Sequence, residues 1–309
     1  MRNKLLHAAI LVCGVSSGGA LSAEPVLPLI DAHFHVMPYM DTAELLQAMD
    51  RHGIRAAGGA AALGGPQRNE EVATALGPRY IRTTGQTQWL SLKQDGGVAA
   101  LENADSPAFK ARLTAIETDL RERGARAIGE IHVNTLNSAA NERVYHKIRG
   151  DAPTLKALFD LAGKYQRPLN VHAEWSGDTA RELLSLAASN REARLILSHC
   201  GVLAPPAEIR EVLQNNPNIF CDLSYRSPPQ LKPRMMQRMI FDAGRLNGDW
   251  KRLIEDYPER FLAGIDDVYN WADYESTARS IRSGLLANLT PGTAEKVAWK
   301  NAQFLYGLE

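Results

Sequence analysis

Six histidine and acidic side chains in this sequence have the chemistry of transition-metal ligands. They are His33, His35, Glu130, His172, His199 and Asp266. Each stands within or just after a short apolar run. Imidazole and carboxylate donors together suit zinc, manganese, nickel or iron(II), and six donors are enough for one ion, or for two ions bridged by a carboxylate. The sequence therefore predicts a divalent metal centre, with zinc as the first choice.

The setting of three of these residues supports the prediction. His33 and His35 are two residues apart, so their side chains point to the same face of an extended segment and can reach one ion. Glu130 interrupts the apolar run 127–131. A carboxylate in such a run is costly unless it is paired or bound to a metal.

Each residue taken alone also has an ordinary structural explanation. Glu130 would fit a buried salt bridge, and His172 and His199 would fit hydrogen-bonded core positions. Asp266, just past an apolar run, would fit a helix cap. However, four of the eight histidines of the chain stand at the ends of such runs. A shared metal explains that coincidence more simply than separate structural roles do.

Eight β-rich runs alternate with segments of helical period. The expected strands are 29–33, 54–58, 80–84, 127–131, 168–172, 194–199, 219–224 and 261–265. The expected helices are 42–52, 70–76, 108–123, 154–165, 179–189, 206–215, 235–242 and 274–287, with a long connection over 86–107 and a last helix over 297–308 that packs on the outside. This alternation is typical of βα units around a parallel sheet.

Eight strands with eight helices predict a single (β/α)8 TIM barrel, an α/β fold. A doubly wound open sheet is the alternative, because periodicity does not show closure. In a barrel the active site lies at the C-terminal ends of the strands. The six candidate ligands fall at those ends.

Composition and charge favour a small-molecule ligand. The chain has 309 residues, 45% of them hydrophobic and 23% charged, which is ordinary for a globular protein. Thirty-five basic residues balance 35 acidic ones. The balance gives no electrostatic reason to expect nucleic acid or an anionic membrane as a partner.

The placement of these residues resembles the amidohydrolase superfamily. In that superfamily an HxH motif ends the first strand, histidines end the fifth and sixth, and an aspartate ends the eighth. The opening Ile30-Asp31-Ala32-His33-Phe34-His35, the Gly264-Ile265-Asp266 segment and the terminal Asn301-Ala302-Gln303-Phe304-Leu305-Tyr306-Gly307-Leu308 are similar to the amidohydrolase-related ("amidohydrolase 2") branch. The similarity covers essentially all of the chain after its first 23 residues.

The resemblance implies roles for the candidate ligands. His33, His35 and Asp266 would hold one metal, and His172 and His199 a second. Many members bridge the two ions with a carboxylated lysine. Glu130 stands at that place here, as in TatD-type nucleases and some lactonases. The resemblance therefore does not decide whether the site holds one metal ion or two. In single-metal members the residue at the place of His199 binds or polarises the substrate.

These roles predict hydrolysis of an ester, lactone, amide or phosphoester by a metal-activated water. Asp266 is the expected general base, and His199 stabilises charge on the attacked oxygen. The loops after the strands supply the expected substrate-binding residues. They are Arg226, which would meet a carboxylate or phosphate, and Tyr39, Trp175 and Trp271, which would wall a pocket.

Three other functions stay open. A single-metal decarboxylase, a lyase of the same branch, would use the same ligands from strands one and eight. A non-catalytic metal-binding or solute-binding barrel would need only the cluster. A nuclease is the least favoured, because the chain has no basic stripe.

The first 23 residues have the order of a secretory signal peptide. Arg2 and Lys4 precede an apolar stretch over 5–15, and small residues lead to Ala23. We expect cleavage after Ala23, which would leave a metal-dependent hydrolase domain over 24–309 without a membrane anchor. The protein would then be periplasmic or secreted, and it could form a homo-oligomer. Export would permit a disulfide between Cys200 and Cys221, but the sequence favours two buried unpaired thiols.

Overall fold

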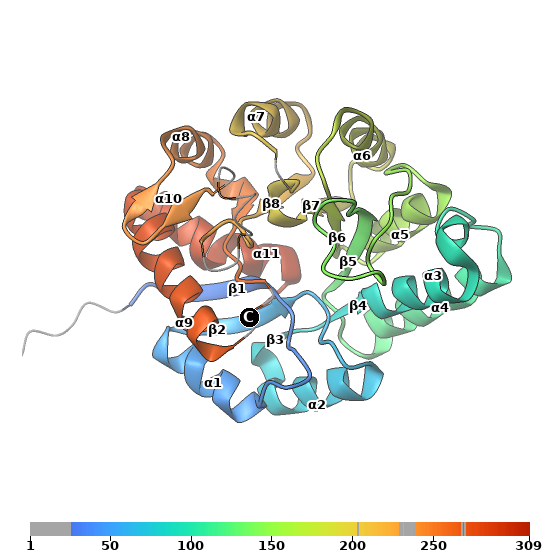
Figure 1. Cartoon of the computed structure of the whole chain (residues 1–309), viewed down its shortest axis with the longest axis horizontal. Helices are drawn as coiled ribbons and strands as arrows, with labels where there is room; N and C mark the ends of the chain where they lie inside the picture. The colour runs from blue at the N-terminus through green and yellow to red at the C-terminus, as the bar shows by residue number, and fades with distance from the viewer. Residues whose placement is uncertain are drawn as a thin grey trace, which may run out of the picture.

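Parallel strands form the centre of the molecule, and helices surround them (Figure 1). The computed structural model describes residues 26–309 except 203, 229–230, 232–235, 237–238, 267 and 269. The predicted signal peptide therefore lies outside the described residues. No helix in the described part of the chain has the length and apolar character needed to cross a bilayer.

The barrel strands follow the predicted order. They are β1 (Leu29–Phe34), β2 (Ile54–Gly59), β3 (Tyr80–Ile81), β4 (Thr83–Gly85), β5 (Ala127–Asn134), β6 (Pro168–Ala173), β7 (Arg194–Leu197), β8 (Ile219–Asp222) and β11 (Phe261–Leu262). The short strands β3 and β4, separated by Arg82, together make the predicted third strand. A small antiparallel pair, β9 (Phe241–Asp242) and β10 (Arg245–Leu246), lies outside the barrel order.

Backbone hydrogen bonds close the barrel. The strands pair in parallel as β1-β2-β3 and as β4-β5-β6-β7-β8-β11. The two ends then meet, because the amide of Ala32 donates to the carbonyl of Ala263 at 3.0 Å and the amide of Ile265 donates to that of His33 at 3.2 Å. The (β/α)8 prediction is confirmed, and the open-sheet alternative is wrong.

The helices alternate with the strands. They are α1 (Thr42–Arg51), α2 (Pro66–Leu76), α3 (Gln86–Ala100), α4 (Pro107–Glu122), α5 (Pro153–Lys164), α6 (Gly177–Ser189), α7 (Pro206–Asn215), α8 (Gly248–Asp256), α9 (Trp271–Ser280), α10 (Pro291–Glu295) and α11 (Asn301–Tyr306). Local signals set several starts: Asp41 caps α1, Ser106 caps α4 ahead of Pro107, and Asn247 caps α8.

Three predictions about helices are wrong. The expected connection over 86–107 contains the helix α3. The expected helix over 235–242 fails at its described end, where Phe241–Asp242 is strand β9, and the helix that precedes β11 is instead α8, whose Trp250, Leu253 and Ile254 are buried. The last helix, expected to pack on the outside over 297–308, does so only at its start: Val297 and Ala298 join the larger apolar cluster, whereas Ala302, Leu305 and Tyr306 of α11 pack against the interior of the barrel.

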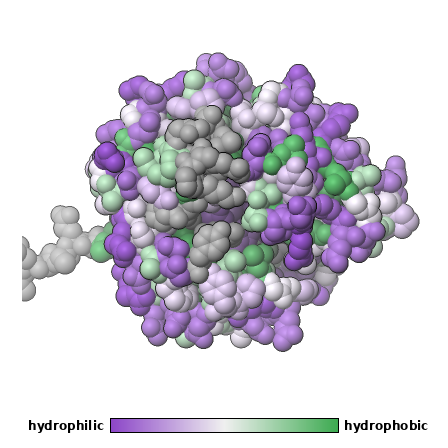
Figure 2. Space-filling view, viewed as in Figure 1, coloured by the Kyte–Doolittle hydropathy of each residue, from purple (hydrophilic) through white to green (hydrophobic). Residues whose placement is uncertain are grey.

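Two apolar clusters hold the barrel together. The larger one fills the space between strands and helices. The smaller one lies inside the barrel and joins strand residues to the last helix: Ile30, Ala32, Ala56, Ile81, Ala127, Ile196, Phe220, Leu262, Ala302, Leu305 and Tyr306. The hydroxyl of Tyr306 donates to the carbonyl of Ala32 at 3.0 Å. Helix α11 therefore seals the interior, while the molecular face in Figure 2 is largely hydrophilic.

Cys200 and Cys221 form a disulfide, which corrects the preference for unpaired thiols. Strands β7 and β8 pair with Leu197 opposite Cys221. The short 3-10 turn η2 (Ser198–Cys200) then brings Cys200 to within 4.6 Å of Cys221, measured between Cα atoms. Sequence spacing alone could not show this, because the turn sets the approach.

Candidate metal centre

All six predicted ligands come together at the C-terminal ends of the strands. Five imidazoles surround the carboxylate of Glu130, which lies in β5. Its Oε1 is 3.1 Å from His172 Nδ1 and 3.4 Å from His199 Nε2. His33 Nε2 is 3.6 Å from the same oxygen, and His35 Nε2 is 3.6 Å from Oε2. The cluster is buried, with Glu130 only 3% exposed.

Asp266 completes the cluster from the segment after β11. Its Oδ1 is 3.6 Å from His33 Nε2 and 4.0 Å from His35 Nε2, and its Oδ2 is 3.7 Å from His199 Nε2. Each of three groups of three donors lies within 4.8 Å: His33 with His35 and Glu130, Glu130 with His172 and His199, and His33 with His199 and Asp222.

These donors fit a divalent metal. Metal–ligand bonds of about 2.1 Å place neighbouring ligand atoms about 3.0–3.5 Å apart, close to the spacing around Glu130. The Nε2 atom of His33 is buried and has no hydrogen-bond partner among the described residues. A buried nitrogen without a hydrogen-bond partner, 3.6 Å from each of two carboxylates, fits a metal ligand.

Hydrogen bonds on the far side of three imidazoles orient them. His33 Nδ1 is 3.0 Å from Asp222 Oδ2, His35 Nδ1 is 2.9 Å from the carbonyl of Ala61, and His199 Nδ1 is 2.8 Å from the hydroxyl of Ser224. A proton on Nδ1 that is donated outward leaves the Nε2 lone pair directed into the cluster. Such outer partners usually fix metal-ligating histidines.

The buried carboxylates of the cluster favour a positive charge beside them. Burial opposes the charged form of His33, but the carboxylates of Asp222 and Glu130 outweigh it and raise its pKa well above the usual value. Burial likewise opposes ionisation of Glu130, yet the imidazoles of His33 and His172 hold its pKa well below the usual range. Glu130 thus remains charged, and its negative charge favours a cation in the cluster.

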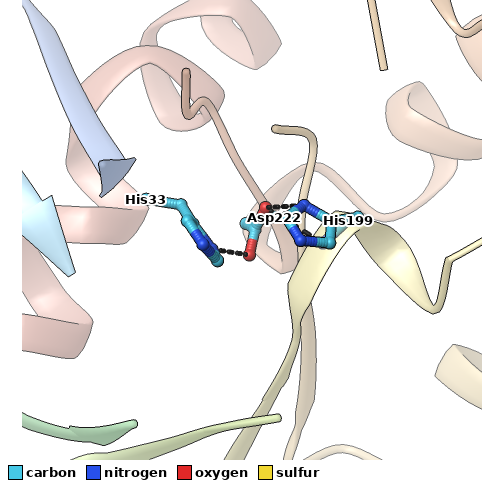
Figure 3. A group of neighbouring side chains, drawn as sticks. All are labelled: His33, His199 and Asp222. Carbon is cyan, nitrogen blue, oxygen red and sulfur yellow. Dashed lines mark hydrogen bonds and ion pairs between the residues drawn. The ribbon is translucent and has the colours of Figure 1, made fainter. Parts of the chain in front are cut away.

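Asp222 is a member of the cluster that the sequence reasoning missed. It ends β8 and lies between two of the predicted ligands (Figure 3). Besides its contact with His33, its Oδ1 accepts from the amide of His199 at 3.1 Å. The rule that found the other ligands, an acid at the end of an apolar run, also applies to Asp222 and could have found it.

His132 was missed as well. It is two residues after Glu130 in β5, and its Nε2 is 3.5 Å from Glu130 Oε2. Burial lowers its pKa to about 3, so its imidazole is neutral at physiological pH. The pairing of β5 with β6 places His132 opposite His172. The spacing of Glu130 and His132, again two residues, was the available signal.

The remaining ligand, His172, is oriented from a loop. Its Nε2 is 2.9 Å from the hydroxyl of Ser138, and that hydroxyl donates to Glu174 Oε1 at 2.8 Å. The serine oxygen can accept a proton from His172 Nε2, and with that proton there the Nδ1 lone pair, 3.1 Å from Glu130 Oε1, would be available to a metal. Glu174, two residues after His172, holds the loop itself through the amides of Asn137 at 2.5 Å and Ser138 at 2.6 Å.

The backbone is strained at the centre. His199 has φ +55°, Tyr225 has φ +54° and Asp266 has φ +77°. Residues other than glycine rarely adopt this left-handed region, and such strain concentrates at functional sites. The expected sixth strand accordingly ends at Leu197, and His199 lies in η2.

A cavity of about 270 Å³ opens above the cluster. Its floor includes His35, Glu130, His132, His172, His199 and Asp266. Its walls come from the segments after β2, β5, β8 and β11 and from the helices α3 and α9: Leu63, Gln86, Leu90, Thr135, Ser138, Ala139, Ala140, Asn141, Arg143, Val144, Tyr225, Val268 and Asp273.

None of the four predicted substrate-binding residues lines this cavity. Arg226 is buried: its Nε donates to the carbonyl of His199 at 2.9 Å, and its guanidinium lies 5.3 Å from the ring centre of Trp250. It supports the backbone of the centre. Tyr39, 57% exposed, donates its hydroxyl proton to the carbonyl of Val268.

The two tryptophans also have other contacts. Trp175 packs where a side chain on Gly201 would stand, and its amide donates to the carbonyl of Val202. Trp271 donates from its ring nitrogen to Glu44 at 2.5 Å, at the start of α9. Position after a strand did not decide which loop side chains turn inward.

Comparison with known families identifies the chain. A model of the family described as amidohydrolase ("Amidohydro_2") matches residues 30–308. The chain belongs to the amidohydrolase family. This amidohydrolase contains its family's barrel and, as the geometry shows, a cluster suited to a divalent metal. No protein with a curated description matches its sequence.

Solved structures share the barrel at low sequence identity. A TIM-barrel protein described as uncharacterized, from Bordetella bronchiseptica, has a TM-score of 0.60 and 13% identity, over 91% of this chain and 99% of its own. The 5-carboxyvanillate decarboxylase from Sphingomonas paucimobilis has a TM-score of 0.55 and 13% identity, over 92% of this chain and 100% of its own. A probable 2-pyrone-4,6-dicarboxylic acid hydrolase from Acinetobacter baumannii has a TM-score of 0.54 and 11% identity, over 91% of this chain and 99% of its own. At these identities the likeness supports the fold alone.

Proposed function

We propose that this amidohydrolase is a metal-dependent hydrolase of a small-molecule ester, lactone, amide or phosphoester. One observation carries the proposal: five of the six predicted donors line the floor of a cavity of about 270 Å³, and the sixth, His33, lies within 3.6 Å of Glu130 and Asp266 beneath it. The cavity admits a compact molecule, and the donors lie where its reactive bond would rest. Zinc is the proposed metal, because three or more imidazoles with carboxylates suit it.

The cluster residues would hold a divalent ion, which would supply an acidified water and polarisation of the bond to be attacked. His33, His35 and Asp266 form one set of donors, and His172 and His199 form another. Glu130 contacts both sets: its Oε1 is near His172, His199 and His33, and its Oε2 is near His35. The donors would suffice for one ion or for two, and counting the metal decides between them.

The chain's own residues supply the proton transfers. Asp266 lines the cavity and keeps both carboxylate oxygens within 4.0 Å of imidazoles of the cluster. We assign it the acceptance of the proton from the attacking water and its delivery to the leaving group. His199 also lines the cavity and either holds the second ion or donates to the attacked oxygen.

The test combines metal counting with turnover. Purified protein is stripped with a chelator, reloaded with Zn²⁺, Mn²⁺, Ni²⁺ or Fe²⁺, and its metal content is measured by mass spectrometry. Each form is assayed on a panel of esters, lactones, amides and phosphoesters. We expect up to two ions per chain and hydrolysis that disappears with the metal and returns with it. Full metal loading without any hydrolysis would contradict the proposal.

Decarboxylation is the second candidate, and the shared fold of 5-carboxyvanillate decarboxylase gives it support. A panel of aromatic carboxylic acids, assayed for released carbon dioxide, separates the two reactions. One ion per chain together with carbon dioxide release would favour the lyase. Tight metal binding with neither reaction would favour the third candidate, a metal-binding or solute-binding barrel.

We further propose that the protein is exported. The sequence of residues 1–23 is the support, because it combines a basic start, an apolar stretch and small residues before Glu24. Expression in a Gram-negative host followed by fractionation should give a periplasmic protein whose N-terminal sequence begins at Glu24. A cytoplasmic protein that retains residues 1–23 would contradict export.

A further inference from the structure

The wall of the cavity contains one cationic side chain that the proposed chemistry does not use. Among the described residues that line the cavity, Arg143 is the single lysine or arginine, and its side chain is exposed. Within the described part of the chain its guanidinium has neither an ion-pair nor a hydrogen-bond partner, whereas its backbone amide donates to Asn141 Oδ1 at 3.0 Å. Most other arginines of the molecule are paired.

The loop that carries Arg143 is fastened on one side by Lys93. The ammonium group of Lys93, from α3, donates to the carbonyls of Glu142 at 2.8 Å, Arg143 at 3.0 Å and Tyr145 at 2.9 Å. Three carbonyls on one ammonium group fix the backbone on both sides of Arg143. The backbone from which the Arg143 side chain extends therefore has a defined position on the cavity wall.

The same loop is fastened on its other side by Glu174 and Thr135. The carboxylate of Glu174 accepts from Asn137 and Ser138, and the Thr135 hydroxyl accepts from the amide of His146 at 3.1 Å. These bonds leave little freedom for the backbone from Thr135 to His146. A loop held in this way loses little entropy when a ligand binds to it, so its arginine is prepared for a contact.

The chemistry of the contact follows from the group. Guanidinium is a planar donor that pairs with carboxylates through two parallel hydrogen bonds. The cavity's other cation would be the metal on the floor, which the reactive bond must reach. The acids that line the cavity, Glu130, Asp266 and Asp273, are either in the cluster or, for Asp273, already bonded to Asn270 at 2.9 Å.

We propose that Arg143 binds a carboxylate of the substrate, so that the enzyme acts on small molecules that carry a carboxylate away from the reactive bond. This inference rests on the proposed function for its reaction, and it adds a substrate class. The carboxylate would sit at the wall, and the ester, lactone or amide at the floor.

The test compares two aryl esters that differ only in this charge. These are 4-acetoxybenzoate and the neutral 4-acetoxybenzamide, both assayed with the zinc-loaded protein that comprises residues 24–309. We expect Arg143→Gln to raise KM for the benzoate by about 10-fold to 100-fold, the range for losing a charged hydrogen-bonded pair, and to change the benzamide constants by less than about twofold. Equal effects on both esters, or no effect, would overturn the proposal.

Arg149→Gln is the matched control. It removes the same charge from an exposed arginine nearby, which is bonded to Asp151 and does not line the cavity. We expect both esters to keep their constants within about twofold in this variant. A loss of the benzoate preference in Arg149→Gln would show that the overall positive charge of this surface selects the anion, and not a direct contact with Arg143. That result would overturn the proposal.

A binding measurement separates this inference from the proposed reaction. Calorimetry with benzoate, benzamide and phenyl phosphate reports on Arg143 even if neither ester is hydrolysed, a result that would count against the hydrolase alone. We expect benzoate to bind more tightly than benzamide, and Arg143→Gln to remove the difference. Benzoate affinity that survives in the variant would assign the carboxylate to the metal, and selective loss of phenyl phosphate would assign a phosphate to Arg143; either outcome overturns the proposal.

Discussion

At the scale of single residues, the candidate metal centre is defined by which nitrogen of each imidazole faces inward. His33, His35 and His199 direct Nε2 to the cluster because Nδ1 is bonded outward. His172 does the reverse, because Ser138 takes its Nε2. The ligand set is therefore a property of the hydrogen bonds around it as much as of the histidines themselves.

Asp266 is expected to carry the proton transfers. Asp266→Asn keeps the shape of the side chain but removes a basic oxygen, so we expect kcat to fall by about 100-fold or more while the melting temperature of the metal-loaded protein is kept. Asp273→Asn, at another aspartate that lines the cavity, is the control and should leave kcat within about threefold. Wild-type turnover in a metal-loaded Asp266→Asn protein would contradict the role.

Ser138 is expected to act as a positioning residue for His172. Ser138→Ala removes the acceptor for His172 Nε2, so the imidazole can turn or change tautomer. We expect metal affinity, measured by competition with a chelator, to fall by about 10-fold to 100-fold. Ser138→Thr should restore most of the affinity because it keeps the hydroxyl.

Ser189→Ala, a serine of α6 that bonds only to the carbonyl of Leu186, is the matched control and should leave metal affinity unchanged. A purely structural role for Ser138 would instead lower the melting temperature of the metal-free protein and leave the affinity of the folded protein alone.

At the scale of elements, a register irregularity in β5 decides where Glu130 points. Ala127 packs inside the barrel, whereas Ile128, Ile131 and Val133 pack outside it. Simple alternation from Ala127 would turn Glu130 outward. The pairing of β5 with β6 shifts between Ile128 and Ile131, which places Glu130 and His132 inside.

Gly129 makes this shift possible. It has φ +135°, and a Cβ atom on it would lie 2.6 Å from the carbonyl oxygen of Asn170. We expect Gly129→Ala to lower the free energy of unfolding by about 3 kcal/mol and to weaken metal binding, because Glu130 would move with the backbone. Chemical denaturation and chelator competition measure the two effects.

Gly124→Ala is the matched control for this element. Gly124 also has a positive φ, +68°, but no atom lies within 4 Å of the position of its Cβ. We expect it to cost about 1 kcal/mol from the backbone conformation alone and to leave metal affinity unchanged. Equal effects of the two substitutions would show that the close approach to Asn170 does not matter.

At the scale of the whole molecule, the centre exists only because the barrel closes. His33 comes from the first strand and Asp266 from the segment after the last, and the amide of Asp266 donates to the carbonyl of His33 at 2.6 Å. The metal ligands thus lie across the closure between β1 and β11. Binding of an ion at this place links the first and last parts of the barrel.

Removal of metal should therefore lower the stability of the whole fold. Metal at about 1,000 times its dissociation constant stabilises the native state by about 4 kcal/mol. We expect a chelator to lower the melting temperature by roughly 5–10 °C and added zinc to restore it. In Glu130→Gln the chelator should have a smaller effect, since fewer donors hold the ion. An identical melting temperature with and without metal in the wild type would contradict the metal centre.

The sequence predicted the barrel strands and most of the donors at their ends. The apolar runs predicted all eight barrel strands, although the third is broken at Arg82 and the sixth ends before His199. Strand ends also predicted six donors that the structure brings together. The failures lie after the strands, in helix α3, in β9 and in the loops that carry Arg226, Tyr39, Trp175 and Trp271. Loop side chains turn according to contacts with distant segments, and local patterns do not contain those contacts.

The sequence by itself therefore determined the order of the elements, the family resemblance and the donor types, because hydrophobic periodicity and residue chemistry are local properties. Only the tertiary structure decided that the barrel closes, that the register shift in β5 turns Glu130 inward, that Ser138 orients His172 and that Arg143 lines the cavity. Each of these depends on register, turns and pairing between segments far apart in the chain, and the physical forces that set them act only once the segments are in contact.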